Sequence, residues 1–213
     1  MNNLKSIIDK LKSSPIFNLS LGNKELFHSN FWYWLCIIYP ETMCSIFKNI
    51  FLELNNMKAI SLLESAHSIK KVKREKEKID LSITFDNDIV LNVENKTKSI
   101  AYISQLEKYS AKESPNNIFL LISLSESDIK TKNWESTTYK YFINSFESIW
   151  TQDSTKLPQN PYYEFLLRDY ICYVKLLDEI IDELFYNKLF LDKKYGEFEA
   201  ELKKFKEIRF DDL

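Results

Sequence analysis

The strongest constraint on the fold is a pair of alternating runs, residues 79–85 and 89–94, on either side of an Asp-Asn-Asp turn signal. Apolar and polar side chains alternate in each run, which is the period of a half-buried strand. A three-residue loop would put Phe85 opposite Ile89 and close an antiparallel hairpin. One face of that hairpin would then carry six apolar side chains for a core, namely Leu81, Ile83, Phe85, Ile89, Leu91 and Val93.

The same register brings charged residues together on the other face. Asp80 lies directly opposite Glu94, with Cβ atoms about 4.5–5.5 Å apart. Lys96 is two residues beyond Glu94 and therefore points to the same side of the sheet. A slip of one residue would separate the carboxylates and spoil the apolar face. Such an arrangement can hold a hard divalent cation between the two carboxylates and place an ammonium group beside it.

Composition excludes several other kinds of protein. Only two glycines occur, Gly22 and Gly196, which argues against a glycine-rich phosphate loop or a dinucleotide fingerprint. Three scattered cysteines do not suit a disulfide framework or a zinc cluster. The first residues lack the apolar core of a signal peptide, and no apolar run reaches membrane-spanning length. We therefore expect a cytoplasmic globular protein without membrane association.

The formal net charge is −2, so any binding to nucleic acid must depend on local charge and on metal ions. The best local candidate is the segment 70–78, in which six of nine residues are basic. An alternative of similar weight is a solvated edge strand that its lysines protect from aggregation. The candidate substrate-binding residues include Lys71, Lys73, Arg74 and, after the hairpin, Lys98.

The order of predicted elements indicates a mixed α/β (α+β) fold. N-terminal helices, including one from 40 to about 54, precede a short helix and a strand ending near residue 75. The hairpin follows, then a helix from about 100 to 112 and a strand at 118–123, which a right-handed crossover places parallel to the second hairpin strand. Beyond that strand we expect only helices, among them 139–150, a long helix starting at Asn160-Pro161, and 197–208. The chain is expected to form a single domain over residues 1–213, with a core at about 20–125 and a helical extension at about 126–213.

At the charged positions the chain resembles the PD-(D/E)XK nuclease superfamily. Ile79-Asp80 stands at the first signature, without its proline, and Glu94-Asn95-Lys96 stands at the second, in the glutamate version. Residues 105–109 look like the Gln-Leu-x-x-Tyr pattern of one bacterial branch. Residues 25–31 and Arg74-Glu75 are similar to that branch's first core helix and first strand. The resemblance covers roughly residues 20–125 and implies a restriction-endonuclease-like αβββαβ core.

The resemblance also implies a metal site. Asp80 and Glu94 would bind Mg²⁺ or Mn²⁺ together with a backbone carbonyl near Asn95 and several waters. Such an ion polarises a phosphodiester oxygen and lowers the pKa of a bound water. Lys96 would orient that water and offset charge on the pentacovalent phosphate.

Further residues have roles implied by the same resemblance. Glu25, on the first core helix, would ligate the metal directly, act through water or bind a second ion. Gln105 would face the site and position the phosphate or Lys96. Tyr109 would support Gln105 or touch substrate.

Each of these assignments has a structural alternative. Asp80 and Lys96 could form only a surface salt bridge. Glu25 could be a first-turn glutamate favoured by the helix dipole, and Gln105 could face solvent. For His28, which lies three residues from Glu25, helix packing or capping is the preferred interpretation, because this chemistry does not require a histidine.

The leading functional hypothesis is a metal-dependent nuclease, a phosphodiester hydrolase acting on DNA in preference to RNA. A context in bacterial defence or mobile elements follows from family analogy alone. The alternative is a non-catalytic module that binds nucleic acid or protein and retains the nuclease fold. A homodimer through the C-terminal helices, or a partner protein that recognises the target, is compatible with the sequence.

Overall fold

The computed structural model describes residues 24–76, 78–97, 101–111, 114–124, 131–152 and 160–185, together with residues 6, 7, 9, 10, 14, 16 and 17. The chain divides into two compact units, Glu25–Pro158 in one and Met1–Lys24 with Gln159–Leu213 in the other. Each unit is described separately below, and the single domain expected from the sequence stays a prediction. Among the helices described, none combines the length and the apolar character that a bilayer span requires.

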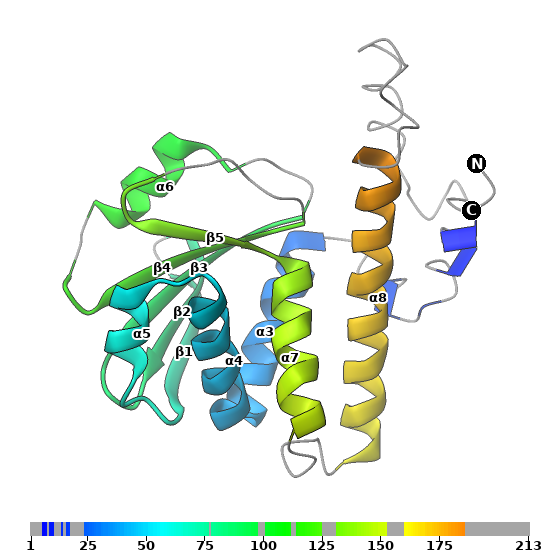
Figure 1. The fold of residues 1–213 in the computed structure, drawn as a ribbon, viewed down its shortest axis with the longest axis horizontal. Helices are drawn as coiled ribbons and strands as arrows, with labels where there is room; N and C mark the ends of the chain where they lie inside the picture. The colour runs from blue at the N-terminus through cyan, green and yellow to red at the C-terminus, as the bar shows by residue number, and fades with distance from the viewer. Residues whose placement is uncertain are drawn as a thin grey trace. The chain divides into compact units, whose positions relative to one another are not determined.

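The unit Glu25–Pro158 consists of helices and one mixed sheet (Figure 1). Its elements in chain order are α3 (Lys24–Ile38), α4 (Pro40–Glu53), α5 (Met57–Leu63), β1 (Ile69–Lys76), β2 (Ile79–Phe85), β3 (Val90–Lys96), α6 (Ile103–Ser110), β4 (Asn117–Ser123), β5 (Trp134–Thr138) and α7 (Tyr139–Gln152). Pro40 occupies the first turn of α4, where its missing N–H has no intrahelical partner to lose. Asn56 caps α5 by accepting a hydrogen bond from the Ala59 N–H at 2.8 Å.

The strands follow one another across the sheet in the order β1-β2-β3-β4-β5. The first three strands are antiparallel, whereas β4 runs parallel to β3 and β5 runs parallel to β4. This arrangement confirms the predicted mixed α+β fold, with its crossover through α6. It also confirms that the lysine-rich segment forms an edge strand, because β1 is the first strand of the sheet.

The hairpin register agrees with the prediction. Leu81 pairs with Val93 and Thr84 with Val90. The Phe85 N–H donates to the Ile89 carbonyl at 2.9 Å, which closes the three-residue loop. All six side chains of the predicted apolar face are buried. Alternation along the two strands therefore fixes which residues reach the opposite face.

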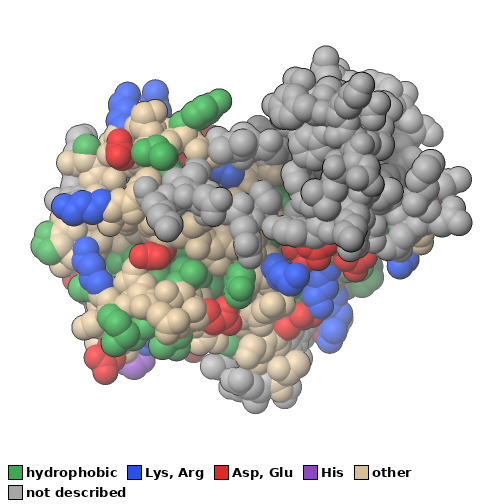
Figure 2. Space-filling model, turned by 45° about the horizontal axis from the view of Figure 1, so that its top comes forward, with side chains coloured by type: hydrophobic (Ala, Val, Ile, Leu, Met, Phe, Trp, Pro, Cys, Tyr) green, Lys and Arg blue, Asp and Glu red, His purple; other side chains and the backbone are tan. Residues whose placement is uncertain are grey.

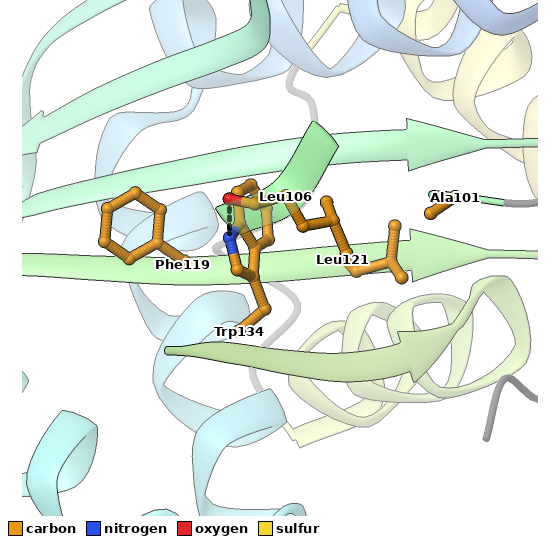
Figure 3. Packing of buried hydrophobic residues seen from close by; sticks show 5 residues of the cluster. All are labelled: Ala101, Leu106, Phe119, Leu121 and Trp134. Carbon is orange, nitrogen blue, oxygen red and sulfur yellow. Dashed lines mark hydrogen bonds between the residues drawn. The ribbon is translucent and has the colours of Figure 1, made fainter. Parts of the chain in front are cut away.

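Helices cover both faces of the sheet. On the face opposite the apolar side of the hairpin, α6 packs through Leu106 against Phe119 and Leu121 of β4 and Trp134 of β5 (Figure 3). The Trp134 indole Nε1 donates to the Leu106 carbonyl at 2.9 Å. Because Glu94 pairs with Leu121, Glu94 lies on this α6 side of the sheet.

One prediction about the later part of the chain is wrong. Everything after the fourth strand was expected to be helical, but Trp134–Thr138 forms β5 at the second edge of the sheet. Pairing with β4, which is buried from Ile118 to Ser123, stabilises this short strand, and its Trp-Glu-Ser-Thr-Thr composition suits a pleated, half-buried position. The helix predicted after it is α7, which begins directly where β5 ends.

Among the described residues of the second unit, Pro161–Phe185 form the long helix α8 at the predicted position. Asn160 caps it by accepting from the Tyr162 N–H at 2.9 Å. Within this unit Asp169 accepts hydrogen bonds from the Ser14 hydroxyl at 3.2 Å and the Ile16 N–H at 3.1 Å. The charged helix predicted at 197–208 lies outside the described residues.

Candidate active site

Two carboxylates meet where the hairpin strands separate. The paired residues of β2 and β3 end at Leu81 and Val93. Beyond that pair, the backbone N–H of Asn95 donates to Asp80 Oδ2 at 2.8 Å. The Glu94 side chain is only 2% exposed. The structure therefore brings Asp80 to the same strand end as the Glu94-Asn95-Lys96 segment, as the register predicted.

Lys96 lies among the acidic side chains. Its Nζ is 2.8 Å from Glu94 Oε1 and 4.0 Å from Glu25 Oε2. Glu25 belongs to the first turn of α3, so a residue distant in the sequence reaches the hairpin charges. The Lys96 side chain is 12% exposed, which is too buried for an ordinary surface salt bridge.

The helix α6 contributes Gln105 to the site. Gln105 Nε2 donates to Glu94 Oε1 at 3.3 Å and to the Tyr109 hydroxyl at 2.8 Å. Tyr109, one turn later, packs against the apolar cluster beneath α6. Gln105 therefore faces the site, and the solvent-facing alternative is wrong. Tyr109 holds the Gln105 amide in place.

The side chain of Asn95 points to the other face of the sheet. Its Nδ2 donates to the Glu25 carbonyl at 2.8 Å and to Ser29 Oγ at 3.2 Å. Its Oδ1 accepts a hydrogen bond from the Tyr139 hydroxyl. These bonds tie α3 and the start of α7 to β3, so any metal contact from Asn95 is left to its backbone carbonyl.

Burial and like charge raise the pKa values of both hairpin carboxylates. The pKa of Glu94 rises to about 7, chiefly because burial disfavours its charged form and then because Asp80 lies nearby. Burial also raises the pKa of Asp80, although the Asn95 N–H and Lys96 oppose the shift. For Lys96, burial lowers the pKa, but the bond to Glu94 and the surrounding carboxylates outweigh it and raise the pKa overall. The cluster thus holds more negative charge than one ammonium can offset.

One oxygen of this cluster lacks a hydrogen-bond partner. Glu94 Oε2 is buried, and among the described residues nothing donates a hydrogen bond to it. Such an atom is costly unless a ligand satisfies it. Within the described part of the chain, no group of three or more His, Cys, Asp or Glu side chains is arranged to hold a metal ion. A site with two carboxylates and retained waters fits Mg²⁺, which rarely occupies an all-protein cage.

The candidate substrate-binding residues lie mainly on β1. Lys71, Lys73 and Arg74 are exposed on this edge strand. Arg74 Nη1 donates to Asn30 Oδ1 of α3 at 2.5 Å, and its guanidinium lies 4.5 Å from the centroid of the Tyr33 ring. Lys98 lies outside the described residues. On the face drawn in Figure 2, basic and acidic side chains are interspersed.

Four contributing residues were not predicted as part of the site, namely Ser29, Asn30, Tyr33 and Tyr139. The signal available for Ser29 and Asn30 is that they are polar residues beside the apolar stripe of α3. His28 has the packing environment preferred from the sequence, since it is fully buried beside the rings of Phe27, Trp32 and Tyr139.

Comparison with known proteins identifies a family. A family model described as the PD-(D/E)XK nuclease superfamily matches residues 16–171, which include the hairpin, α6 and α7. Searches of the curated proteins and of the solved structures each returned no match.

Proposed function

The chain belongs to the PD-(D/E)XK nuclease superfamily, and we propose that it is a metal-dependent nuclease that hydrolyses phosphodiester bonds in DNA. Superfamily membership suggests a nuclease. The observation that supports catalysis is the convergence of Asp80, Glu94 and Lys96 at one strand end, where Glu94 Oε2 is buried and lacks a hydrogen-bond donor among the described residues.

Asp80 and Glu94 fit a hard divalent cation, Mg²⁺ or Mn²⁺. Both side chains supply oxygen ligands, and burial together with nearby like charge raises their pKa values, so a bound cation would stabilise their ionised forms. The Asn95 N–H points to Asp80, and the N–H and C=O of one strand residue lie on the same side, so the Asn95 carbonyl is a suitable third ligand. A bound cation there would polarise the phosphate and lower the pKa of the attacking water.

The remaining side chains have distinct tasks. Lys96, whose pKa is raised, stays protonated at neutral pH and stabilises negative charge that develops on the phosphate oxygens. Gln105 fixes the rotamer of Glu94 through the hydrogen bond at 3.3 Å. Glu25 lies near Lys96 and either orients the ammonium, holds a water or contacts a second ion.

The choice of DNA over RNA, and a place in bacterial defence or mobile elements, are proposed by family analogy. A cytoplasmic location is proposed together with this role. Target recognition through a homodimer or a partner protein is compatible with a chain whose net charge is −2, because such a chain attracts a polyanion only locally.

A cleavage assay tests the proposal. Supercoiled plasmid, linear duplex, single-stranded DNA and RNA are incubated with the purified protein and Mg²⁺ or Mn²⁺. We expect metal-dependent cleavage that Asp80→Asn and Lys96→Ala each reduce by about 10²–10³-fold. The control is Lys58→Ala, which removes an exposed lysine of α5 that has no role in the proposed site.

Two results would contradict the proposal. One is the absence of cleavage with every substrate and metal. The other is cleavage that persists undiminished in Asp80→Asn and Lys96→Ala. Nucleic-acid or protein binding without any cleavage would favour the non-catalytic module instead.

A further inference from the structure

A groove of about 600 Å³ lies between α3 and β1, within the unit Glu25–Pro158. Leu26, Asn30 and Tyr33 line it from the helix, and the consecutive residues 72–76 line it from the edge strand. It is distinct from the strand end that carries Asp80 and Glu94, and none of the catalytic roles above uses its walls.

The groove opens next to the carboxylates. Leu26 directly follows Glu25, whose carboxylate is 4.0 Å from Lys96 Nζ. On the opposite wall, Glu75 lies between Arg74 and Lys76, which pair with Leu81 and Ile79, so Glu75 stands opposite Asp80 in the β1–β2 ladder. Glu75 also has a φ of 51°, and such non-glycine conformations persist only where the surroundings hold them. A chain molecule whose reacting bond sits at Asp80 and Glu94 can therefore continue into this groove.

Arg74 is held in a fixed position on the groove wall. Its Nη1 is bonded to Asn30 Oδ1 at 2.5 Å, and the guanidinium lies 4.5 Å from the centre of the Tyr33 ring. An exposed arginine ordinarily loses rotamer entropy when it binds a ligand. Here two contacts within the protein have already restricted the side chain, although Arg74 is exposed.

The chemistry of the groove suits a phosphate. A guanidinium has five N–H donors in a planar fork, which matches two oxygens of one phosphate group. Lys73 and Lys76 line the same groove, so its walls carry three basic side chains and one acidic side chain, Glu75. This local balance is positive, whereas the chain as a whole has a formal charge of −2.

We propose that the α3–β1 groove binds the backbone of a nucleic-acid strand beside the cleaved bond, with Arg74 as a bidentate ligand of a neighbouring phosphodiester. Asn30 and Tyr33 position Arg74 for this contact. The proposal rests on the proposed nuclease function of the adjacent site and specifies how that site engages a polymer rather than an isolated phosphodiester.

Binding of fluorescein-labelled DNA oligonucleotides, measured by anisotropy in EDTA so that cleavage is absent, tests the groove. We expect Arg74→Ala to raise Kd by about 10–100-fold and to reduce the salt dependence of log Kd by about one phosphate contact. Arg74→Lys keeps the charge without the fork and should recover only part of the affinity. Tyr33→Leu and Asn30→Ala should each weaken binding by releasing the guanidinium.

Lys58→Ala is the control, since it removes an exposed lysine of α5 that does not line the groove, and its Kd should stay within twofold of wild type. Thermal melts of Arg74→Lys and Asn30→Ala establish that weaker binding comes from a folded protein. A Kd for Arg74→Ala within twofold of wild type, or an equal loss of affinity in Lys58→Ala, contradicts strand binding in the groove while leaving the proposed cleavage activity untouched. A wild-type protein that neither binds nor cleaves any nucleic acid contradicts strand binding in the groove together with the proposed function.

Discussion

The backbone N–H of Asn95 donates a 2.8 Å hydrogen bond to the carboxylate of Asp80, immediately beyond the last paired residues of β2 and β3. In a regular antiparallel ladder, a backbone carbonyl of β2 would accept this N–H. Here the side-chain oxygen of Asp80 accepts it instead. Because this bond ties Asp80 to the residue that follows Glu94, the backbone of the two strands sets the separation of the carboxylates. The site is therefore prearranged for a ligand before any cation binds.

Metal affinity should depend on pH through Glu94. The pKa of this carboxyl is about 7 in the metal-free protein, and a carboxylate must lose its proton before it can ligate. We expect the affinity for Mn²⁺ to fall by up to about tenfold for each pH unit below 7 and to level off above it. Isothermal titration calorimetry between pH 5.5 and 8 measures this. An affinity that does not change over that range would contradict the assignment of Glu94 as a ligand.

The same pKa shift predicts how stability varies with pH. Between about 4.5 and 7 the folded protein keeps a proton on Glu94 that the unfolded chain has lost, so the metal-free protein loses stability as pH rises through this window. Glu94→Gln removes the titrating group. Relative to wild type, this variant should gain stability as pH rises, and Mn²⁺ should no longer raise its melting temperature. The unfolding free energy of each protein is measured by urea denaturation across this pH range. If the two free energies change with pH in parallel, the prediction is refuted.

Asn95 and Tyr139 should act as a coupled pair. Their hydrogen bond belongs to the group that ties α3 and α7 to β3. We expect Asn95→Ala to cost about 1–3 kcal/mol of unfolding free energy because it leaves buried partners unsatisfied. Cleavage should slow by about 10–100-fold as Glu25 loses its position. In a double-mutant cycle with Tyr139→Phe the two losses should not add, and strict additivity would show that the pair is not coupled.

Trp134 should control the position of α6 and, through it, Gln105. Trp134→Phe keeps an aromatic ring in the cluster of Figure 3 but removes the donor that the Leu106 carbonyl accepts. We expect a loss of about 1–3 kcal/mol in unfolding free energy and faster hydrogen exchange across Ile103–Ser110. The exposed Tyr141 provides a control, because Tyr141→Phe should change stability by less than about 0.5 kcal/mol. Equal effects of the two substitutions would argue against this role.

The hairpin could be predicted from the sequence because its physics is local. Alternation in two short runs determines which side chains share each face of the hairpin, and the three-residue loop determines the strand register. Together they place Asp80 beside the end of the strand that carries Glu94. The position of the Lys96 side chain on the same face as Glu94 follows from the same alternation. Placing Gln105 in the site required one further inference, namely that the crossover helix carrying it lies over the sheet face that carries Glu94.

The parts that were missed depend on long-range packing. Tyr139 reaches Asn95 from 44 residues away, and Arg74 meets Asn30 across the same separation. Such contacts exist only once α3, α7 and the sheet have packed together, and no local pattern encodes them. The strand β5 was missed for a similar reason, since its five residues become a strand by pairing with β4.

The central claim is that Asp80 and Glu94 together hold a divalent cation. Anomalous diffraction from crystals of the protein soaked with Mn²⁺ tests it most directly. We predict a peak within bonding distance of a carboxylate oxygen of each residue, with Glu94 Oε2 among the ligands, and no such peak in Glu94→Gln. A fully occupied Mn²⁺ that touches neither carboxylate, or no peak between them at saturating metal, would contradict the account.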